Sequence, residues 1–505
     1  MKTTRFFSIV LTVMFLAILF VNTAFSECTT LIVGKDASVD GSVLFAHNED
    51  LSSDTAQTIE VHPRVSFKPG EVMISELGME IPQVEMTNKY IQFNSDYNNL
   101  TEARVPYNAD NPNGFNEWQV VTGDNADQCR VELTEAYPSH YKLEEGVTSA
   151  ELKRLVAERA KSARDAVEIM GGLIETYGFA KDGGGGMMYS IADANEGWVV
   201  EAYVGKQWAA VRCPDNAMLV RANSGRIGDM DLKDTANFLG SKDLVTFATE
   251  KGWYNPKTDG KFNYMKVYGL PKNNAAASNR LRELNLVNYF SPSKKMASID
   301  DELPENMIII PDRKISKEDL MAWERSHYEG TEYDLSEGYT KGDPHHTTNR
   351  VICVTSTQSS TVAQMRNWLP NEIGGVLWVS ESYPCASVYQ PWYLGITGSP
   401  DVYLGATDKF DTEKAFWRFE EIGILANANY AELIKIIKPV WEDQEKTEFA
   451  LQESIEKTAL ELYQKGADFA SSYLTNYSNS WAMTSYEKTV MLKKAILTNL
   501  AQKGK

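Results

Sequence analysis

The sequence predicts an α+β fold, built as one large domain with a helical C-terminal extension. Apolar and β-branched runs bounded by turn residues cluster at residues 29–47 and 187–222. Residues 148–178 have helical periodicity with capping residues, and from Asp411 the pattern is helical nearly to the end. We find no repeat of about 20 to 50 residues and no low-complexity linker, so one domain is the simplest interpretation.

The first predicted element is a β-hairpin that begins beside Cys28. Its strands are residues 29–33 and 42–47, and Asp40-Gly41 supplies a tight turn between them. The following stretch, residues 54–112, mixes short strand-like runs with prolines. We therefore expect an excursion off the main sheet there.

Two helices are predicted next. Thr148 and Glu151 fit a capping box at the start of the first helix. Ser162 with Asp165 begins the second helix, which ends at Gly178. We expect both helices to cover one face of a sheet.

Four strands in an antiparallel meander are predicted after these helices, at residues 187–192, 197–203, 207–213 and 217–222. The polar stretch that follows predicts short helices and loops over residues 233–345. Strands are expected to return at residues 350–355 and 375–380. The final helical region is expected to break at Pro439 and around residues 475–484.

Composition argues against two classes of partner. The 505-residue chain has a net charge of −19, and like charge opposes binding to nucleic acid or to an anionic membrane. We expect neither nucleic acid nor an integral membrane partner. The acidic surface is compatible with a homo-oligomer but does not demonstrate one.

Residues 1–26 resemble a secretory signal peptide. Lys2 and Arg5 precede an apolar run that ends in small or polar residues, and the run is short for a membrane span. The expected location is therefore outside the cytoplasm, periplasmic or secreted. A retained N-terminal anchor is the alternative, and lipid modification of Cys28 is disfavoured because Glu27 is bulky and charged.

The other cysteines and the histidines give weaker signals. The five cysteines, at residues 28, 129, 213, 353 and 385, would permit two disulfides with Cys28 left unpaired. No CxxC motif occurs, which argues against a cysteine zinc site. His345 and His346 adjoin Asp343, but no third ligand is evident, so a solvated loop is the favoured interpretation. We expect no metal and no cofactor.

Cys28 is the strongest candidate nucleophile. Removal of the leader and Glu27 would give Cys28 a free α-amine beside its thiol. In model compounds an α-amine titrates near pH 7.7 to 8.0, so it can accept the thiol proton without help from histidine. While Glu27 remains attached, this nitrogen is an amide and cannot act as a base.

Three residues are candidate partners of Cys28. Asp50 ends the predicted hairpin and is placed to accept a hydrogen bond from the α-ammonium. Asn223 ends the predicted meander, where its side-chain amide is a candidate oxyanion donor. His47 is expected on the opposite face from Asp50 or toward the rim, because side chains alternate along a strand. Singly, Asp50 and Asn223 are equally explained as turn or cap residues.

Several segments together resemble the PepD-type cysteine dipeptidases, which are N-terminal nucleophile hydrolases related to secernins and bile-salt hydrolases. The similar segments are residues 28–35, 40–42, 47–50, 158–166, 191–201, 223–228, 362–366 and 387–389. The resemblance covers most of residues 28–400, and its order and spacing make it more specific than any single motif.

The resemblance implies a four-layer αββα sandwich and cleavage of small peptides. In that family pattern Cys28 is the nucleophile, Asp50 contacts its amine and Asn223 supports the oxyanion. His47 stands where many members have arginine near the thiol, and Arg350 is a candidate additional site arginine. The implied organisation is a signal peptide at residues 1–26, a hydrolase domain at 27–410 and a helical extension at 411–505 packed on it.

The leading hypothesis is an exported cysteine dipeptidase that acts through a thioester on Cys28 after removal of Glu27. Its expected substrate is a small peptide. One alternative is hydrolysis of non-peptide N-acyl amines, because one fold supports several activities. The other is an exported binding protein that has lost catalysis, which the histidine at position 47 leaves open.

Overall fold

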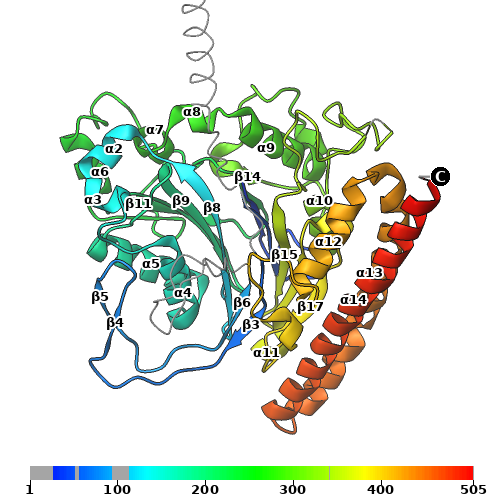
Figure 1. Cartoon of the computed structure of the whole chain (residues 1–505). Helices are drawn as coiled ribbons and strands as arrows, with labels where there is room; N and C mark the ends of the chain where they lie inside the picture. Colours follow the sequence, from blue (N-terminus) through cyan, green and yellow to red (C-terminus); the bar gives the residue numbers. More distant parts are fainter. Residues whose placement is uncertain (1–26, 52–55, 94–112, 341, 504–505) are drawn as a thin grey trace, which may run out of the picture.

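The computed structural model describes residues 27–51, 56–93, 113–340 and 342–503. Two β-sheets face each other at the centre of this part of the chain, and helices cover their outer faces (Figure 1). The predicted leader, residues 1–26, lies outside the described residues.

The first sheet has seven strands in the order β14-β12-β1-β2-β15-β16-β17. Their bounds are β1 Thr29–Val33, β2 Val43–Asp50, β12 Met218–Arg221, β14 Ile308–Ile309, β15 Thr357–Met365, β16 Val376–Glu381 and β17 Gln390–Tyr393. Within the described residues, neighbouring strands of this sheet pair antiparallel. Strand β1, which directly follows Cys28, is therefore held between β12 and β2 near the centre of the sheet.

The second sheet has eight strands in the order β13-β11-β10-β9-β8-β7-β6-β3. Their bounds are β3 Glu60–His62, β6 Tyr90–Phe93, β7 Asn113–Asn116, β8 Val121–Gln128, β9 Gly185–Ala192, β10 Gly197–Tyr203, β11 Trp208–Cys213 and β13 Phe238–Gly240. The two sheets pack closely. A Cβ added to Gly123 of β8 would lie 2.7 Å from the Phe45 ring of β2, so only glycine fits there.

Helices α4 (Ser149–Arg159) and α5 (Ala163–Tyr177) cover the outer face of the eight-stranded sheet. On the other side, α10 (Lys317–Glu324) and α12 (Ala415–Asn427) pack against the seven-stranded sheet, with α13 (Tyr430–Tyr463) and α14 (Ala467–Lys503) beside them. The predicted αββα sandwich is therefore confirmed. The division at residue 410 stays a prediction.

The remaining elements are short, with one exception. They are the β4 (Val72–Ile74) and β5 (Glu80–Pro82) hairpin, helices α2 (Val131–Ala136), α3 (Pro138–Tyr141), α6 (Leu244–Glu250), α7 (Tyr264–Tyr268), α8 (Pro271–Asn274), α9 (Ala277–Phe290) and α11 (Asn371–Gly374), and 3₁₀ turns η1 (Pro292–Lys294), η2 (Glu305–Met307), η3 (Pro384–Ala386) and η4 (Asp401–Tyr403). Helix α9, at 14 residues, is the exception.

Both predicted helix starts are confirmed by their caps. The Thr148 hydroxyl accepts from the Glu151 amide, and the Glu151 side chain accepts from the Thr148 amide. At α5, Ser162 caps the Asp165 amide and Gly178 ends the helix with φ 81°. The capping residues, together with the helical periodicity that follows them, were enough to locate both helices.

The predicted meander is wrong in its last strand. Strands β9, β10 and β11 do form an antiparallel meander. Strand β12, however, crosses to the other sheet, where Arg221 pairs with Thr30 of β1. The alternating pattern gives a strand's faces but not its neighbour, and the crossing brings the end of β12 to Cys28.

Two other expectations need correction. Residues 350–355 form no strand, and the strand begins at Thr357. The hairpin loop is long and spans residues 34–42. Within it Ser38 pairs with Ile315, and the turn follows at Gly41, whose φ is 85°. Of the predicted excursion, β4 and β5 leave the sheet, β3 and β6 belong to its edge, and residues 52–55 and 94–112 lie outside the described residues.

The C-terminal helices break where no proline stands. Pro439 lies inside α13, and residues 475–484 lie inside α14. The breaks occur instead at residues 428–429 and 464–466, the second at Gly466 with φ 153°. A proline removes one helical hydrogen bond, and packing against α14 and the sheet compensates for that loss.

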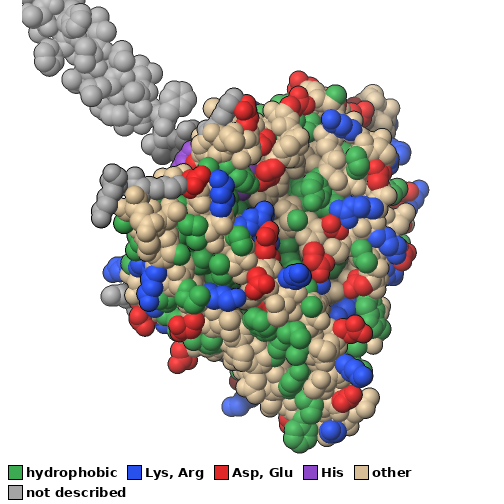
Figure 2. Space-filling model, turned by 90° about the vertical axis from the view of Figure 1, so that its right-hand side faces the viewer, with side chains coloured by type: hydrophobic (Ala, Val, Ile, Leu, Met, Phe, Trp, Pro, Cys, Tyr) green, Lys and Arg blue, Asp and Glu red, His purple; other side chains and the backbone are tan. Residues whose placement is uncertain are grey.

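Figure 2 looks onto the side where α13 and α14 lie in Figure 1, and acidic, basic and hydrophobic side chains are interspersed there. In the described part of the chain, no helix is both long and apolar enough to cross a membrane. The same residues contain no disulfide, and all five cysteines are buried.

Candidate active site

The thiol of Cys28 is buried between the two sheets at the start of β1. The β1–β2 register pairs Thr29 with Asn48, which places Cys28 beside Glu49 and Asp50. The thiol lies 3.5 Å from Glu49 Oε1, to which it donates, and it accepts from the Asp50 amide at 3.4 Å. The predicted nucleophile is therefore held rigidly at the end of a central strand.

Two guanidinium groups meet on the carbonyl oxygen that precedes Cys28. Arg282 Nη1 donates to Glu27 O at 2.6 Å, and Arg350 Nη2 donates to the same oxygen at 2.7 Å. Arg350 Nε also holds the Glu27 side chain, at 2.8 Å from Oε2. These donors are aimed where negative charge would develop if a nucleophile attacked the Glu27 carbonyl.

Asp50 orients Arg350. The two side chains form a buried ion pair, and the Thr357 hydroxyl donates to the other Asp50 oxygen. Burial raises the pKa of Asp50, and the Arg350 charge and the Thr357 hydrogen bond oppose that rise. The carboxylate thus fixes the guanidinium that contacts the Glu27 carbonyl.

Arg282 connects Cys28 to Asn223. It projects from α9 and donates to the Cys28 carbonyl oxygen at 2.8 Å and to Asn223 Oδ1 at 3.1 Å. Its side chain is fully buried, and burial lowers its pKa. The interaction with Asn223 makes that amide part of the same hydrogen-bond network as the nucleophile.

Asn223 faces a small cavity beside Glu27. Its Nδ2 donates to the Ala126 carbonyl at 3.0 Å, and its position follows from the crossing of β12 to the seven-stranded sheet. The cavity holds about 140 Å³ and is lined by Glu27, Ala126, Asp127, Gln128, Asn223, Asn273, Ala276, Ser278 and Asn279. The lining is rich in amide and carboxylate groups, which suits a small polar ligand.

His47 is linked to the thiol by Glu49, and one donor atom from each of the three residues lies within 4.8 Å of the others. His47 Nε2 lies 2.9 Å from Glu49 Oε2, and its Nδ1 lies 2.8 Å from the Thr30 hydroxyl. The Thr30 hydroxyl donates to Asn125 Oδ1, so it accepts from His47 Nδ1. His47 is fully buried against the other sheet and is not at the rim. A proton must then lie between His47 and Glu49, next to the nucleophile.

The structure brings together all six residues singled out from the sequence: Glu27, Cys28, His47, Asp50, Asn223 and Arg350. Sequence reasoning missed Arg282, Glu49 and Asn125, whose Nδ2 donates to the Cys28 carbonyl at 2.6 Å. Glu49 directly precedes Asp50, so its position at the end of the predicted hairpin could have identified it as well. Arg282 and Asn125 carried no motif that would have identified them.

A different group of side chains corrects the interpretation of His345. Its side chain is 0% exposed, so the expected solvated loop is wrong for His345, while His346 beside it is 69% exposed. His345 clusters with His327, Cys353 and Cys385. None of these four residues belongs to the Cys28 network described above.

Comparisons with known proteins give matches over most of the chain. The sequence model described as peptidase family C69 matches residues 27–443. A probable dipeptidase from Salmonella dublin is 32% identical over 374 residues, which cover 73% of this chain and 81% of that protein. Dipeptidase A from Lactobacillus helveticus is 28% identical over 421 residues, which cover 80% and 83%.

A solved structure of penicillin V acylase from Agrobacterium tumefaciens aligns with 73% of this chain and 86% of that chain. The identity is 12% and the TM-score is 0.34, which is too low to carry an argument.

Proposed function

Because the chain belongs to peptidase family C69, we propose that it is an exported cysteine dipeptidase whose nucleophile is an N-terminal Cys28. One observation carries the proposal: Arg282 and Arg350 both donate to the carbonyl oxygen of Glu27, whose peptide bond to Cys28 must be cut. That geometry supports attack by a group placed where the Cys28 thiol lies. The relatives named as dipeptidases support small peptides as the substrate class.

The first reaction of this site is its own maturation. The Cys28 thiol attacks the Glu27 carbonyl carbon, and the oxyanion forms between Arg282 and Arg350. Collapse breaks the Glu27–Cys28 amide, so the nitrogen gains the thiol proton and Glu27 becomes a thioester on sulfur. Water then hydrolyses the thioester, which releases the leader with Glu27 as its C-terminal carboxylate. The free α-amine of Cys28 remains.

Each later turnover repeats this chemistry on a substrate. With Glu27 gone, its carbonyl position and the adjoining cavity are open to a peptide carbonyl. The α-amine accepts the thiol proton, Asp50 holds the amine, and Arg282, Arg350 and Asn223 surround the oxyanion. The substrate's amine leaves, and water assisted by the α-amine hydrolyses the acyl-enzyme.

The size of the cavity favours short substrates. The cavity volume of about 140 Å³ is small compared with ligand pockets of roughly 300 to 1,000 Å³. Removal of Glu27, which lines the cavity, would add the volume of that residue. A dipeptide is matched to that space better than a long chain. Hydrolysis of a non-peptide N-acyl amine is the second candidate, because the same donors would serve any acyl group.

The test combines intact mass with turnover. Wild-type full-length protein is expected to mature to a chain that starts at Cys28 and to hydrolyse a dipeptide panel faster than an N-acyl amine panel. Cys28→Ala is expected to keep Glu27 and show no hydrolysis of either panel. Cys213→Ser, which changes another buried thiol, is the matched control and should mature normally.

Contrary outcomes separate the alternatives. Faster turnover of the N-acyl amines than of the dipeptides would favour an acylase. A mature protein with no reactive thiol at Cys28 and no turnover of either panel would favour the binding protein. Loss of Glu27 from Cys28→Ala would point to an external protease instead of self-cleavage. Export is tested separately, by fractionating cells that express the full chain.

A further inference from the structure

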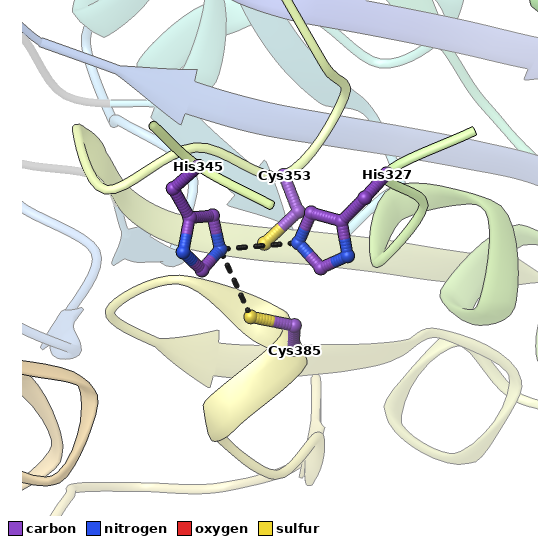
Figure 3. A group of neighbouring side chains, drawn as sticks. All are labelled: His327, His345, Cys353 and Cys385. Atoms are coloured by element: carbon purple, nitrogen blue, oxygen red, sulfur yellow. Dashed lines mark hydrogen bonds between the residues drawn. The ribbon is translucent and has the colours of Figure 1, made fainter. Parts of the chain in front are cut away.

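Four metal-binding side chains converge on one point away from the Cys28 network. His327, His345, Cys353 and Cys385 each offer one donor atom, and all four atoms lie within 4.8 Å of one another (Figure 3). The Nε2 atoms of the two histidines are 3.0 Å apart, and Cys385 Sγ is 3.4 Å from His345 Nε2. We propose that these residues form a structural Zn²⁺ site with Cys₂His₂ ligation.

Two of the donor separations are close to those around a tetrahedral zinc ion. With Zn–N near 2.0–2.1 Å and Zn–S near 2.3 Å, neighbouring donors are about 3.3 to 3.8 Å apart. The two measured donor separations, 3.0 and 3.4 Å, lie within a few tenths of an ångström of that range. Four protein ligands leave no open position, which is the arrangement of structural zinc sites.

The outer hydrogen bonds fix both imidazoles as ligands. His327 Nδ1 lies 3.0 Å from Glu329 Oε1, and His345 Nδ1 lies 2.9 Å from Asp343 Oδ1. Because carboxylates only accept, both Nδ1 atoms carry a proton, which leaves Nε2 of each ring as the atom that can bind a metal. Carboxylate–histidine–zinc contacts of this kind are the usual outer shell of zinc sites.

Burial and charge also suit zinc. Both histidine side chains are 0% exposed, and Cys353 is 0% and Cys385 9% exposed. Two thiolates and two neutral imidazoles balance the charge of Zn²⁺, so the site avoids an uncompensated buried charge. Soft thiolate and imidazole ligands select zinc over magnesium or calcium. A cavity of about 460 Å³ reaches Cys385 and Glu329 and provides a path of entry.

The site ties down a long irregular segment. Among the described residues from 325 to 356 there is no helix or strand, and three of the ligands come from that segment. The fourth, Cys385, comes from η3 beyond β16. Arg350, which contacts Glu27 and Asp50, stands three residues before Cys353. Zinc would therefore fix the segment that carries this arginine, which has no helix or strand to hold it in place.

The primary test is the metal content of the full-length protein, purified without chelator or immobilised metal. We expect one zinc per chain in wild type, and loss of that zinc in His345→Ala and Cys385→Ser. His346→Ala and Cys129→Ser are matched controls, since one changes the exposed neighbouring histidine and the other a buried thiol elsewhere. Both controls should keep the zinc.

A second measurement on wild type keeps the proposal falsifiable if the ligand variants fail to fold. X-ray absorption at the zinc edge should show two sulfur atoms at about 2.3 Å and two nitrogen atoms at about 2.0–2.1 Å. Absence of zinc after incubation with a zinc salt would overturn the proposal. So would a mapped Cys353–Cys385 disulfide, or zinc with a shell of oxygen atoms. None of these readouts depends on peptidase activity.

Discussion

The Glu27 carbonyl oxygen accepts from Arg282 and Arg350, and the Asp50 carboxylate fixes one of those guanidiniums. Arg282 and Arg350 thus bring two buried positive charges to the peptide bond between Glu27 and Cys28, which the Cys28 thiol can attack. Holding them there costs desolvation, and their benefit appears when negative charge develops on that oxygen. At the residue scale, this contact is what connects the two steps of the function proposed above, release of Glu27 and later peptide hydrolysis.

Arg282→Gln is predicted to slow release of Glu27 by about 100-fold or more, since loss of one oxyanion donor typically costs about 10² to 10³ in rate. Intact mass measured over time after synthesis gives the rate. Arg164→Gln, which changes a 37% exposed arginine on α5, is the control and should process at the wild-type rate. An Arg282→Gln chain that is folded by circular dichroism and processes normally would contradict this role.

The sequence allowed Cys28, Asp50 and Asn223 to be predicted because each ends or begins a strand with clear turn signals. Arg282 could not be predicted in the same way. Helix α9 lies in the polar stretch that predicted only short helices and loops, and its buried face carries Asn279, Arg282 and Glu283. These polar residues are buried together with apolar ones, so the apolar positions of the helix do not mark out one clear face.

Helix α13 contains an acid that the fold keeps protonated. Glu448 is fully buried, and burial raises its pKa to about 9 from a usual 4.5. The unfolded chain loses this proton near pH 4.5 while the folded chain keeps it. Stability therefore falls as pH rises from about 4.5 to 9, by at most tenfold in the folding equilibrium per pH unit.

In wild type, ionisation of Glu448 is expected to lower the folding equilibrium constant by about a hundredfold or more between pH 5 and pH 8. Glu448→Gln is predicted to remove this part of the decrease. Urea unfolding at both pH values measures it. Glu442→Gln, at a 60% exposed acid on the same helix, should leave the pH dependence unchanged. An equal pH dependence in wild type and Glu448→Gln would show that Glu448 ionises normally in the fold.

Pro439→Ala is predicted to raise stability by up to about 3 kcal/mol, the cost of proline within a helix. Pro439 is exposed and lies inside α13, so alanine restores one backbone hydrogen bond without disturbing the core. Urea unfolding measures the gain. Pro370→Ala, at the N-cap of α11, is the control and should bring no gain, and an unchanged midpoint for Pro439→Ala would refute the prediction.

The same helix shows why element ends were harder to predict than elements. The sequence favoured a break at Pro439, but α13 continues through it because its apolar face stays packed. Strand β12 shows a related limit. Its residues gave the correct strand, and only its pairing with β1 determined which sheet it joins.

Across the whole molecule, the four layers share their cores between distant parts of the sequence. The core between the sheets is continuous with the core under the C-terminal helices, which includes Phe419, Leu433, Ile437 and Trp441. The layer order was predictable only through the family resemblance, because local patterns do not report which sheet a strand joins. The helical C-terminus itself was evident from its periodicity.

A chain that ends at residue 410 is therefore predicted to be insoluble or aggregated. Removing α12, α13 and α14 exposes the outer face of the seven-stranded sheet, and a large apolar surface in water drives association. Size-exclusion chromatography of the soluble fraction measures the outcome, with a chain ending at residue 503 as control. A soluble monomer of residues 27–410 with a cooperative melt would contradict the prediction.

The most direct test of the central claim is the N-terminal mass of the protein that hydrolyses dipeptides. The account predicts a mass that begins at Cys28, with the active fraction rising as Glu27 is lost, and no such species from Cys28→Ala. Full dipeptidase activity in a chain that still carries Glu27 would contradict it, because the nitrogen of Cys28 would then be an amide and could not serve as the base.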